Sequence, residues 1–260
     1  MGLLERIRLN VDDARMFGPG ILMRHVARIT GAQTTRVNIP SVGPVHVRVG
    51  ESDMAALRQV FGEGDYDLGA TSPVTERIRA RAAAIKREGG VPVIVDAGAN
   101  IGAASLWFRA TYPGIALVAI EPEPVNAAVL HRNLDALPDV TVLDAAVGAQ
   151  PGFVSIANDV SGWGARTLPS EHGIPVVTIA EAVAKIPGGV PLIVKIDIEG
   201  FERELFAHNL DWIADAYAVI IEPHDWMLPG QQSSRNFQRA MAAHDFELFL
   251  SGENMIYVRV

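Results

Sequence analysis

Four residues in the segment VIVDAGANIGAAS have types and spacing suited to holding a small ligand. Asp96 ends an apolar run that predicts a strand, and Gly98, Asn100 and Gly102 follow before a predicted helix. Glycines at such a turn let the backbone approach a ligand closely and enter the helix. The dinucleotide fingerprint G-x-G-x-x-G would need a second glycine where Asn100 stands. We therefore expect a ligand-binding loop that differs from the usual pyrophosphate loop.

Acidic residues end the next two predicted strands. Glu121 follows the strand after the glycine loop, where an acid can accept both hydroxyls of a ribose. Asp144 and the backbone of Ala145 follow the third strand, where they could meet an adenine amino group and ring edge. Asp96 would repel a pyrophosphate but could receive an ammonium group. S-adenosylmethionine, which joins an adenosine to an amino-acid end, fits these expectations.

The segment PLIVKIDIEGFE carries charged residues on and after a later apolar strand. Lys195 and Asp197 are two residues apart and therefore share one face of that strand. An apolar strand holds charges at little cost only where they are paired or functional. We expect Asp197 and Lys195 to act in catalysis and Glu199 to contact the substrate. Glu202 is expected to favour a helix N-terminus.

Glu222 and His224 share a face at the end of the following strand, YAVIIEPHDW. A neutral imidazole can take a hydroxyl proton near pH 7, so His224 is a candidate general base. Asp197, Glu222 and His224 also form a candidate ligand set for a divalent cation. Two carboxylates and one histidine can equally form a hydrogen-bonded network without an ion.

The glycine-rich segment DVSGWGARTL (159–168) predicts a loop over the same edge of the sheet. Trp163 could offer a flat face to a sugar or another ring, and Arg166 is a second candidate substrate contact. The alternative is an ordinary connection with one packing aromatic residue.

The elements that position these residues alternate between strand and helix from residue 91 onward. Such alternation predicts an α/β fold with a doubly wound, mostly parallel sheet. The last two strands (246–250 and 254–260) are joined by a short turn and predict an antiparallel C-terminal hairpin. Residues 154–157 are expected to add an edge strand, 174–179 a strand, and 199–209 a helix. Before this region we expect an amphipathic helix and a hairpin, which form an N-terminal extension (1–70) ahead of the main domain (71–260).

Composition excludes several classes of protein. The chain of 260 residues is 49% hydrophobic, carries a net charge of −8 and has no cysteine. Disulfides, thiolate zinc sites and cysteine nucleophiles are therefore excluded. A nucleic-acid-binding surface normally needs a basic footprint, which this charge argues against. No apolar run reaches the ~18 residues of a membrane helix, and we expect a cytoplasmic protein.

The chain resembles the FkbM-type family of S-adenosylmethionine-dependent methyltransferases. The matching strings are DMAALRQVFGEGDYD, VIVDAGANIGAAS, AIEPEPVNAAVLHRNL, LDAAVGAQPG, VKIDIEGFERELF and IIEPH, in the family's order. The resemblance implies a seven-stranded, Rossmann-like class I methyltransferase fold. It also implies methyl transfer to a hydroxyl of a small molecule such as a sugar, a polyketide or a lipid headgroup.

The resemblance also assigns residues. Those it implies in the cofactor site are Tyr66, Asp96, Gly98, Asn100, Gly102, Glu121, Pro122, Asp144, Ala145 and Asp197. It matches Asp197 and Glu199 to the family's D-x-E-G segment. Residues 1–45 are not covered by it.

Alternatives remain open at this point. A non-catalytic protein that binds an adenosyl cofactor, an NAD-type oxidoreductase and an RNA methyltransferase are the competing functions. The acceptor, the need for a metal, the identity of the base and the oligomeric state, including a homodimer, are left open by the sequence.

Overall fold

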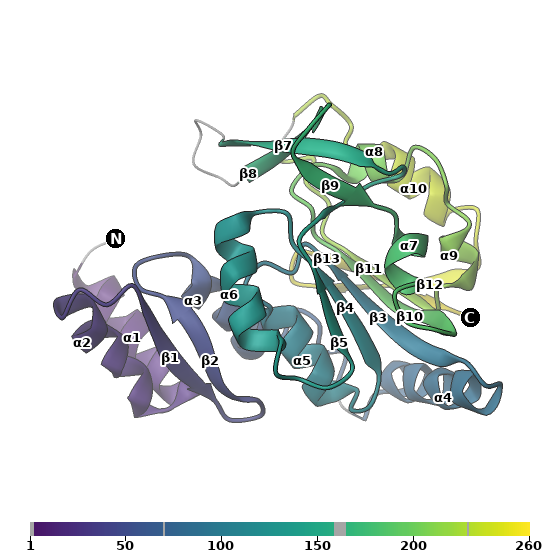
Figure 1. Ribbon diagram of the computed structural model, residues 1–260. Coiled ribbons are helices and arrows are strands. Elements are labelled where there is room, and N and C mark those ends of the chain that lie inside the picture. Colours follow the sequence, from purple (N-terminus) through teal and green to yellow (C-terminus); the bar gives the residue numbers. More distant parts are fainter. Residues whose placement is uncertain (1–2, 70, 159–164, 228) are drawn as a thin grey trace.

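The computed structural model describes residues 3–69, 71–158, 165–227 and 229–260, and its centre is a seven-stranded sheet (Figure 1). The strand order across the sheet is β12-β13-β11-β10-β3-β4-β5. Strands β11, β10, β3, β4 and β5 are parallel to one another, whereas β13 is antiparallel to β11 and β12. In that order the strands span Phe246–Ser251, Asn254–Arg259, Ala218–Ile221, Gly189–Ile196, Val91–Ala97, Ala116–Ile120 and Val140–Leu143. The expected seven-stranded, doubly wound sheet with an antiparallel C-terminal hairpin is confirmed.

Helices cover both faces of this sheet because its central strands are apolar on both faces. One face packs against α4 (Pro73–Arg87), α5 (Ala103–Thr111) and α6 (Pro124–Leu134). The other face packs against α7 (Ile179–Val183), α8 (Glu202–Leu205), α9 (Trp212–Asp215) and α10 (Arg235–Met241). Among the described residues, no helix combines the length and the apolar character needed to cross a membrane.

Strands β3 and β10 lie side by side at the point where the chain switches direction across the sheet. From β3 the chain continues to β4 and β5 on one side, and later to β10 and β11 on the other. Ligands of open α/β sheets bind in the crevice at this point, outside the carboxyl ends of the strands. Glu121, Asp144, Asp197 and Glu222 each follow directly on the carboxyl end of one of these strands.

A second, four-stranded sheet lies over the carboxyl edge of the first, in the order β6-β9-β7-β8 (Figure 1). Its strands are Ala146–Val147, Ile174–Val177, Gly152–Asn158 and Ala165–Ser170. Two expectations are thereby corrected: segment 154–157 is not an edge strand of the main sheet, and 174–179 does not join its strand–helix alternation. In β9 Val176 is buried and Pro175 is exposed, so this strand is covered on one face only.

The expected helix at 199–209 is shorter than the sequence indicates, since α8 begins only at Glu202 and ends at Leu205. Glu199 and Gly200 have φ values of 49° and 92°. Left-handed backbone interrupts a right-handed helix, so the chain turns here before α8 begins. The turn keeps Asp197 and Glu199 at the carboxyl edge of the sheet.

The expected N-terminal helix and hairpin are both present. They comprise α1 (Leu3–Phe17), η1 (Pro19–Leu22), α2 (Met23–Ile29), β1 (Thr34–Ile39) and β2 (Gly43–Arg48). The short helix α3 (Asp53–Arg58) and the π-helical turn η2 (Gln59–Glu63) lead to α4. Buried valines of the hairpin belong to the same hydrophobic cluster as α5, α6 and one face of the sheet. The extension therefore shares its core with the sheet.

Asn133 on α6 fastens the hairpin to the glycine loop. Its Oδ1 accepts the backbone N–H of His46 at 2.7 Å, and its Nδ2 donates to the His46 carbonyl at 3.1 Å. The same Nδ2 donates to the carbonyl of Ile101 at 2.8 Å. One amide side chain thus satisfies polar groups of strand β2 and of the glycine loop together.

Replacing Asn133 by alanine is expected to lower the free energy of unfolding by about 1–3 kcal/mol, because it leaves these partly buried backbone groups unpaired. Chemical denaturation of Asn133→Ala and of the exposed neighbour variant Arg132→Ala measures the difference. Equal stability of the two variants would contradict the fastening role.

Candidate active site

The glycine loop connects β3 to α5 through three left-handed residues. Gly98, Asn100 and Gly102 have φ values of 79°, 51° and 90°. A Cβ on Gly98 would stand 1.7 Å from the carbonyl oxygen of Asp197, so only glycine fits there. Asparagine adopts left-handed backbone more readily than most residues, which allows it at position 100. The loop therefore passes directly against the end of β10.

Asp96 lies beneath this loop rather than in it. Its side chain is 0% exposed, and its Oδ2 accepts the hydroxyl of Ser105 at 2.6 Å. Its Oδ1 is 3.1 Å from Nζ of Lys195, which is its direct neighbour across β3 and β10. Lys195 also donates to the carbonyl of Gly98 at 2.8 Å. Asp96 and Lys195 therefore shape the loop from below. Asp96 is not among the residues that line the pocket, and its contact with a ligand ammonium stays a prediction.

The charges around Lys195 keep it protonated. Burial alone would lower the pKa of its ammonium group, but the charges of Asp96 and Asp197 raise the pKa well above its usual value. Such a lysine holds its proton at every physiological pH. It acts as a fixed cation under the loop rather than as a group that exchanges protons with a substrate.

Glu121 stands at the end of β4 and is held in place by backbone groups. Its Oε2 accepts the N–H of Asn100 at 2.8 Å, and its Oε1 accepts the N–H of Glu123 at 3.0 Å. Burial raises the pKa of this carboxyl, while the hydrogen bonds from Glu123 and Asn100 act in the opposite direction. The hydrogen bond from Asn100 thus holds Glu121 against the glycine loop.

A pocket of about 660 Å³, its open mouth included, lies at the carboxyl edge between these elements. Its lining includes the predicted residues Gly98, Asn100, Glu121, Pro122, Ala145, Asp197 and Glu199. Glu123 adds a further carboxylate, and Ile156 of β7 and Phe201 add apolar surface. The described lining holds four carboxylates and no lysine, arginine or histidine. Such a pocket favours a cationic ligand and repels a phosphate-bearing one.

Two buried acceptors in the pocket lining have no hydrogen-bond partner, Oδ1 of Asn100 and Oε2 of Glu199. Buried polar atoms are normally satisfied, and an unsatisfied one costs free energy. A ligand that donates hydrogen bonds would satisfy both.

Asn126 of α6 belongs to the pocket although the sequence did not single it out. Its Nδ2 lies 3.4 Å from Oε1 of Glu121, and its Oδ1 accepts from Arg48 of β2 at 2.8 Å. Arg48 is in turn paired with Asp53, the two closest atoms being 2.6 Å apart. The N-terminal extension therefore contacts the pocket through Arg48, which donates to the pocket residue Asn126. No local pattern could have revealed this contact, because it joins residues 78 positions apart.

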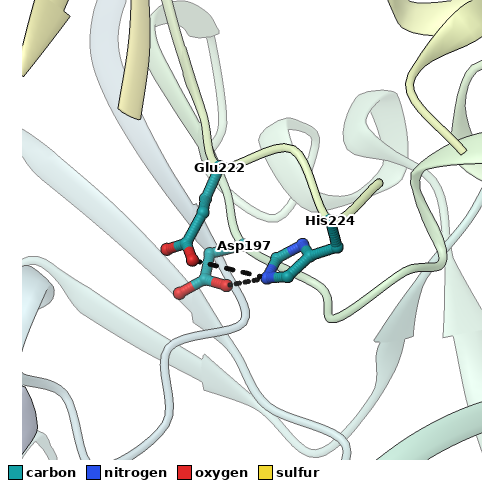
Figure 2. A group of neighbouring side chains, drawn as sticks. All are labelled: Asp197, Glu222 and His224. Carbon is teal, nitrogen blue, oxygen red and sulfur yellow. Dashed lines mark ion pairs between the residues drawn. The ribbon is translucent and has the colours of Figure 1, made fainter. Parts of the chain in front are cut away.

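Asp197, Glu222 and His224 converge beside the pocket, as Figure 2 shows. Nε2 of His224 lies 3.7 Å from Oδ1 of Asp197 and 3.5 Å from Oε1 of Glu222. Nδ1 of His224 is hydrogen-bonded to Glu202 at 2.7 Å. Asp197 belongs both to this cluster and to the pocket lining. Glu202, expected only to favour a helix N-terminus, is the residue that orients the imidazole.

The cluster concentrates negative charge. Burial, followed by the charge of Asp197, raises the pKa of both Glu199 and Glu222 to about 7. Burial opposes protonation of His224, but the hydrogen bond and charge of Glu202 outweigh it and raise the pKa of the imidazole to about 9. The hydrogen bond with Glu202 therefore favours the protonated imidazole in the free cluster, and the role of His224 as a general base stays a prediction.

Tyr66 and Asp144, like Asp96, Gly102 and Lys195, are not among the residues that line the pocket. Tyr66 is buried against Trp107 and Phe108 of α5. Asp144 is 67% exposed and its Oδ1 lies 2.9 Å from Nε2 of His131. Arg166 stands opposite Ala157 in the β7–β8 pair, and Trp163 lies outside the described residues.

Comparisons with known proteins give one family. The family model of the Methyltransferase FkbM domain matches residues 96–254, more than half of the chain. Methyltransferase sdnD from Sordaria araneosa is 47% identical over 84 residues, which are 31% of this chain and 32% of that protein. The match thus spans about a third of that relative's length.

Two solved structures have a similar chain path. The cofactor-bound structure of Rv0187 from MTB has a TM-score of 0.41 at 13% identity, covering 80% of this chain and 89% of that one. The O-methyltransferase from Bacillus cereus in complex with SAH has a TM-score of 0.39 at 13% identity, covering 80% of this chain and 91% of that one.

Replacing Gly98 by alanine is expected to destabilise the protein by about 1–3 kcal/mol more than replacing Gly89, because of the clash with Asp197. Gly89 is a matched control, since its φ of 84° carries the same left-handed strain but its Cβ would meet nothing within 4 Å. Urea unfolding of Gly98→Ala and Gly89→Ala measures both losses. Similar losses would show that the loop does not press against β10.

Proposed function

Because the chain belongs to the FkbM-domain family of methyltransferases, we propose that it transfers a methyl group from S-adenosylmethionine to a hydroxyl of a small molecule. The observation that carries this proposal is the charge of the pocket. It has four carboxylates and no basic side chain in its described lining. S-adenosylmethionine is a cation at its sulfonium and carries an ammonium group, so its charge complements this lining.

The residues present fit that cofactor. Glu121 at the end of β4 is placed to accept ribose hydroxyls, with Asn126 beside it. The unpartnered Oδ1 of Asn100 and Oε2 of Glu199 supply acceptors for ammonium or hydroxyl donors. Pro122 and Ala145 supply apolar contacts for an adenine. Asp96 and Lys195 are assigned to positioning the loop, since neither lines the pocket.

The proposed reaction is an in-line displacement. The cofactor supplies a methyl group whose C–S bond breaks as a C–O bond forms, and the sulfur keeps the electron pair. The chain has to hold the acceptor oxygen in line, and positioning of this kind can supply ~7–11 kcal/mol. The acceptor proton passes to the cluster of Asp197, Glu222 and His224, of which Asp197 also lines the pocket.

The competing functions are less compatible with the site. A dinucleotide would bring a diphosphate against four carboxylates, which disfavours an NAD-type oxidoreductase. A cofactor-binding protein without catalysis would have no use for the buried Glu222–His224–Glu202 arrangement next to the pocket. The net charge of −8 disfavours an RNA acceptor.

Replacing Glu121 by alanine is expected to weaken S-adenosylhomocysteine binding roughly 10- to 100-fold, because a lost hydrogen bond to a charged group costs about 1.5–3 kcal/mol. Isothermal titration calorimetry measures this change. The 2′,3′-dideoxy analogue serves as control, since it lacks both hydroxyls and should bind wild type and Glu121→Ala with similar affinity. Unchanged binding of the hydroxylated compound would remove the ribose assignment.

The activity itself is tested by incubating the protein with radiolabelled S-adenosylmethionine and a panel of sugars, polyketides and lipid headgroups with free hydroxyls. Label transferred to one acceptor class, and lost in Asp197→Asn, would support the proposal. Cofactor binding without transfer to any acceptor would favour the non-catalytic alternative.

A further inference from the structure

The cluster of Asp197, Glu222 and His224 has the spacing of ligands around one ion. One ligand atom from each residue lies within 4.8 Å of the others. The two distances from Nε2 of His224, 3.5 and 3.7 Å, are too long for good hydrogen bonds. Ligands around one divalent ion at about 2.1–2.4 Å stand about 3.0–4.8 Å apart. The three ligand atoms therefore have the spacing of groups that coordinate one divalent cation.

The surroundings of His224 point to a ligand independently of that spacing. Its side chain is 4% exposed, and that of Glu202 is 1% exposed. Their 2.7 Å hydrogen bond fixes the ring so that Nε2 faces the two carboxylates (Figure 2). Metal-binding histidines nearly always donate their other N–H to a carboxylate, a carbonyl or a water in this way. Glu202 is itself held by the N–H of Gly200 at 3.1 Å.

A second cluster of one histidine and two carboxylates shows the contrast. His131 lies between Asp135 and Asp144, with both ring nitrogens at direct hydrogen-bonding distances of 2.8 and 2.9 Å. Its side chain and both carboxylates are more than a third exposed. Both ring nitrogens of His131 are thus already hydrogen-bonded to carboxylates. Nε2 of His224 lies 3.5 Å or more from the two carboxylates that it faces.

We propose that Asp197, Glu222 and His224 bind one divalent transition-metal ion beside the pocket, next to Asp197 in its lining. One imidazole and two carboxylates suit a first-row ion such as Mn²⁺ better than Ca²⁺, which prefers oxygen ligands alone. Glu222 and His224 are nearly buried, but Asp197 is 30% exposed and lines the pocket. The open coordination positions therefore face the pocket.

The ion defines the class of acceptor, a step that rests on the proposed function. Six-coordinate geometry leaves about three positions beyond the protein ligands. An acceptor with a hydroxyl next to a second oxygen, such as a vicinal diol or an α-hydroxy carbonyl, fills two of them. An ion held there would lower the pKa of the bound hydroxyl, so that its proton would leave to water.

Titration of the metal-free protein with Mn²⁺, followed by electron paramagnetic resonance and calorimetry, tests the ion site without any need for activity. We expect about one ion per chain. His224→Ala and the isosteric Glu222→Gln should each weaken binding at least tenfold. Glu202→Gln, which alters only the orienting residue, should weaken it about 10- to 100-fold.

His131→Ala is the matched control and should bind Mn²⁺ as wild type does, with thermal melting used to check that every variant is folded. Binding that is absent, or that survives both His224→Ala and Glu222→Gln, overturns the ion site.

The same preparations separate this proposal from the proposed function. S-adenosylhomocysteine titration reports on the cofactor pocket alone. Mn²⁺ binding without S-adenosylhomocysteine binding would sustain the ion site and overturn the methyltransferase assignment. S-adenosylhomocysteine binding without Mn²⁺ binding would sustain the proposed function and overturn the ion site.

Once an acceptor is found, we expect Mn²⁺-dependent turnover of a vicinal diol but not of its monohydroxy analogue. Equal turnover of both would overturn the acceptor class.

Discussion

The buried ion pair between Asp96 and Lys195 is the constraint on which the site depends. It joins β3 to β10 where the sheet switches direction, and both side chains are almost fully buried. Removing one partner of such a pair leaves an uncompensated charge that costs about 3–5 kcal/mol. Lys195 also binds the carbonyl of Gly98 and lies 3.5 Å from Asp197. The ammonium group of Lys195 thus fixes the glycine loop relative to Asp197 at the end of β10.

The carboxyl edge of the sheet has two compartments that meet at Asp197. On one side lies the acidic pocket, whose carboxylates suit a cation. On the other lie Glu222 and His224, held from behind by Glu202. Because Asp197 belongs to both, a ligand in the pocket and a reacting group at the cluster would be held in one fixed geometry. The N-terminal extension contributes to the same geometry, since Arg48 contacts Asn126 and Asn133 binds both β2 and the glycine loop.

The fold was predictable from the sequence wherever a pattern is local. The apolar run before Asp96 and the short turn between the last two predicted strands each specify their own element, and each element occurs in the structure. The assignment of strands to sheets was not predictable for 154–157 and 174–179. Strand β9 pairs with β6 and β7, and β7 pairs with β8 and β9, so contacts between separate segments, not a local pattern, place both strands in the second sheet.

By itself, the sequence determined which side chains reach the carboxyl edge, because an acid that follows an apolar parallel strand has to lie there. Glu121, Asp197 and Glu222 were identified in this way. Only the tertiary structure decided which of the predicted acids line the pocket. Asp96 lies on the strand face that packs under α5 and is neutralised by Lys195, whereas Asp197 opens into the pocket. The contacts of Glu202 with His224 and of Asn126 with Arg48 also appear only in the tertiary structure. Local sequence patterns cannot predict a hydrogen bond between residues that are distant along the chain.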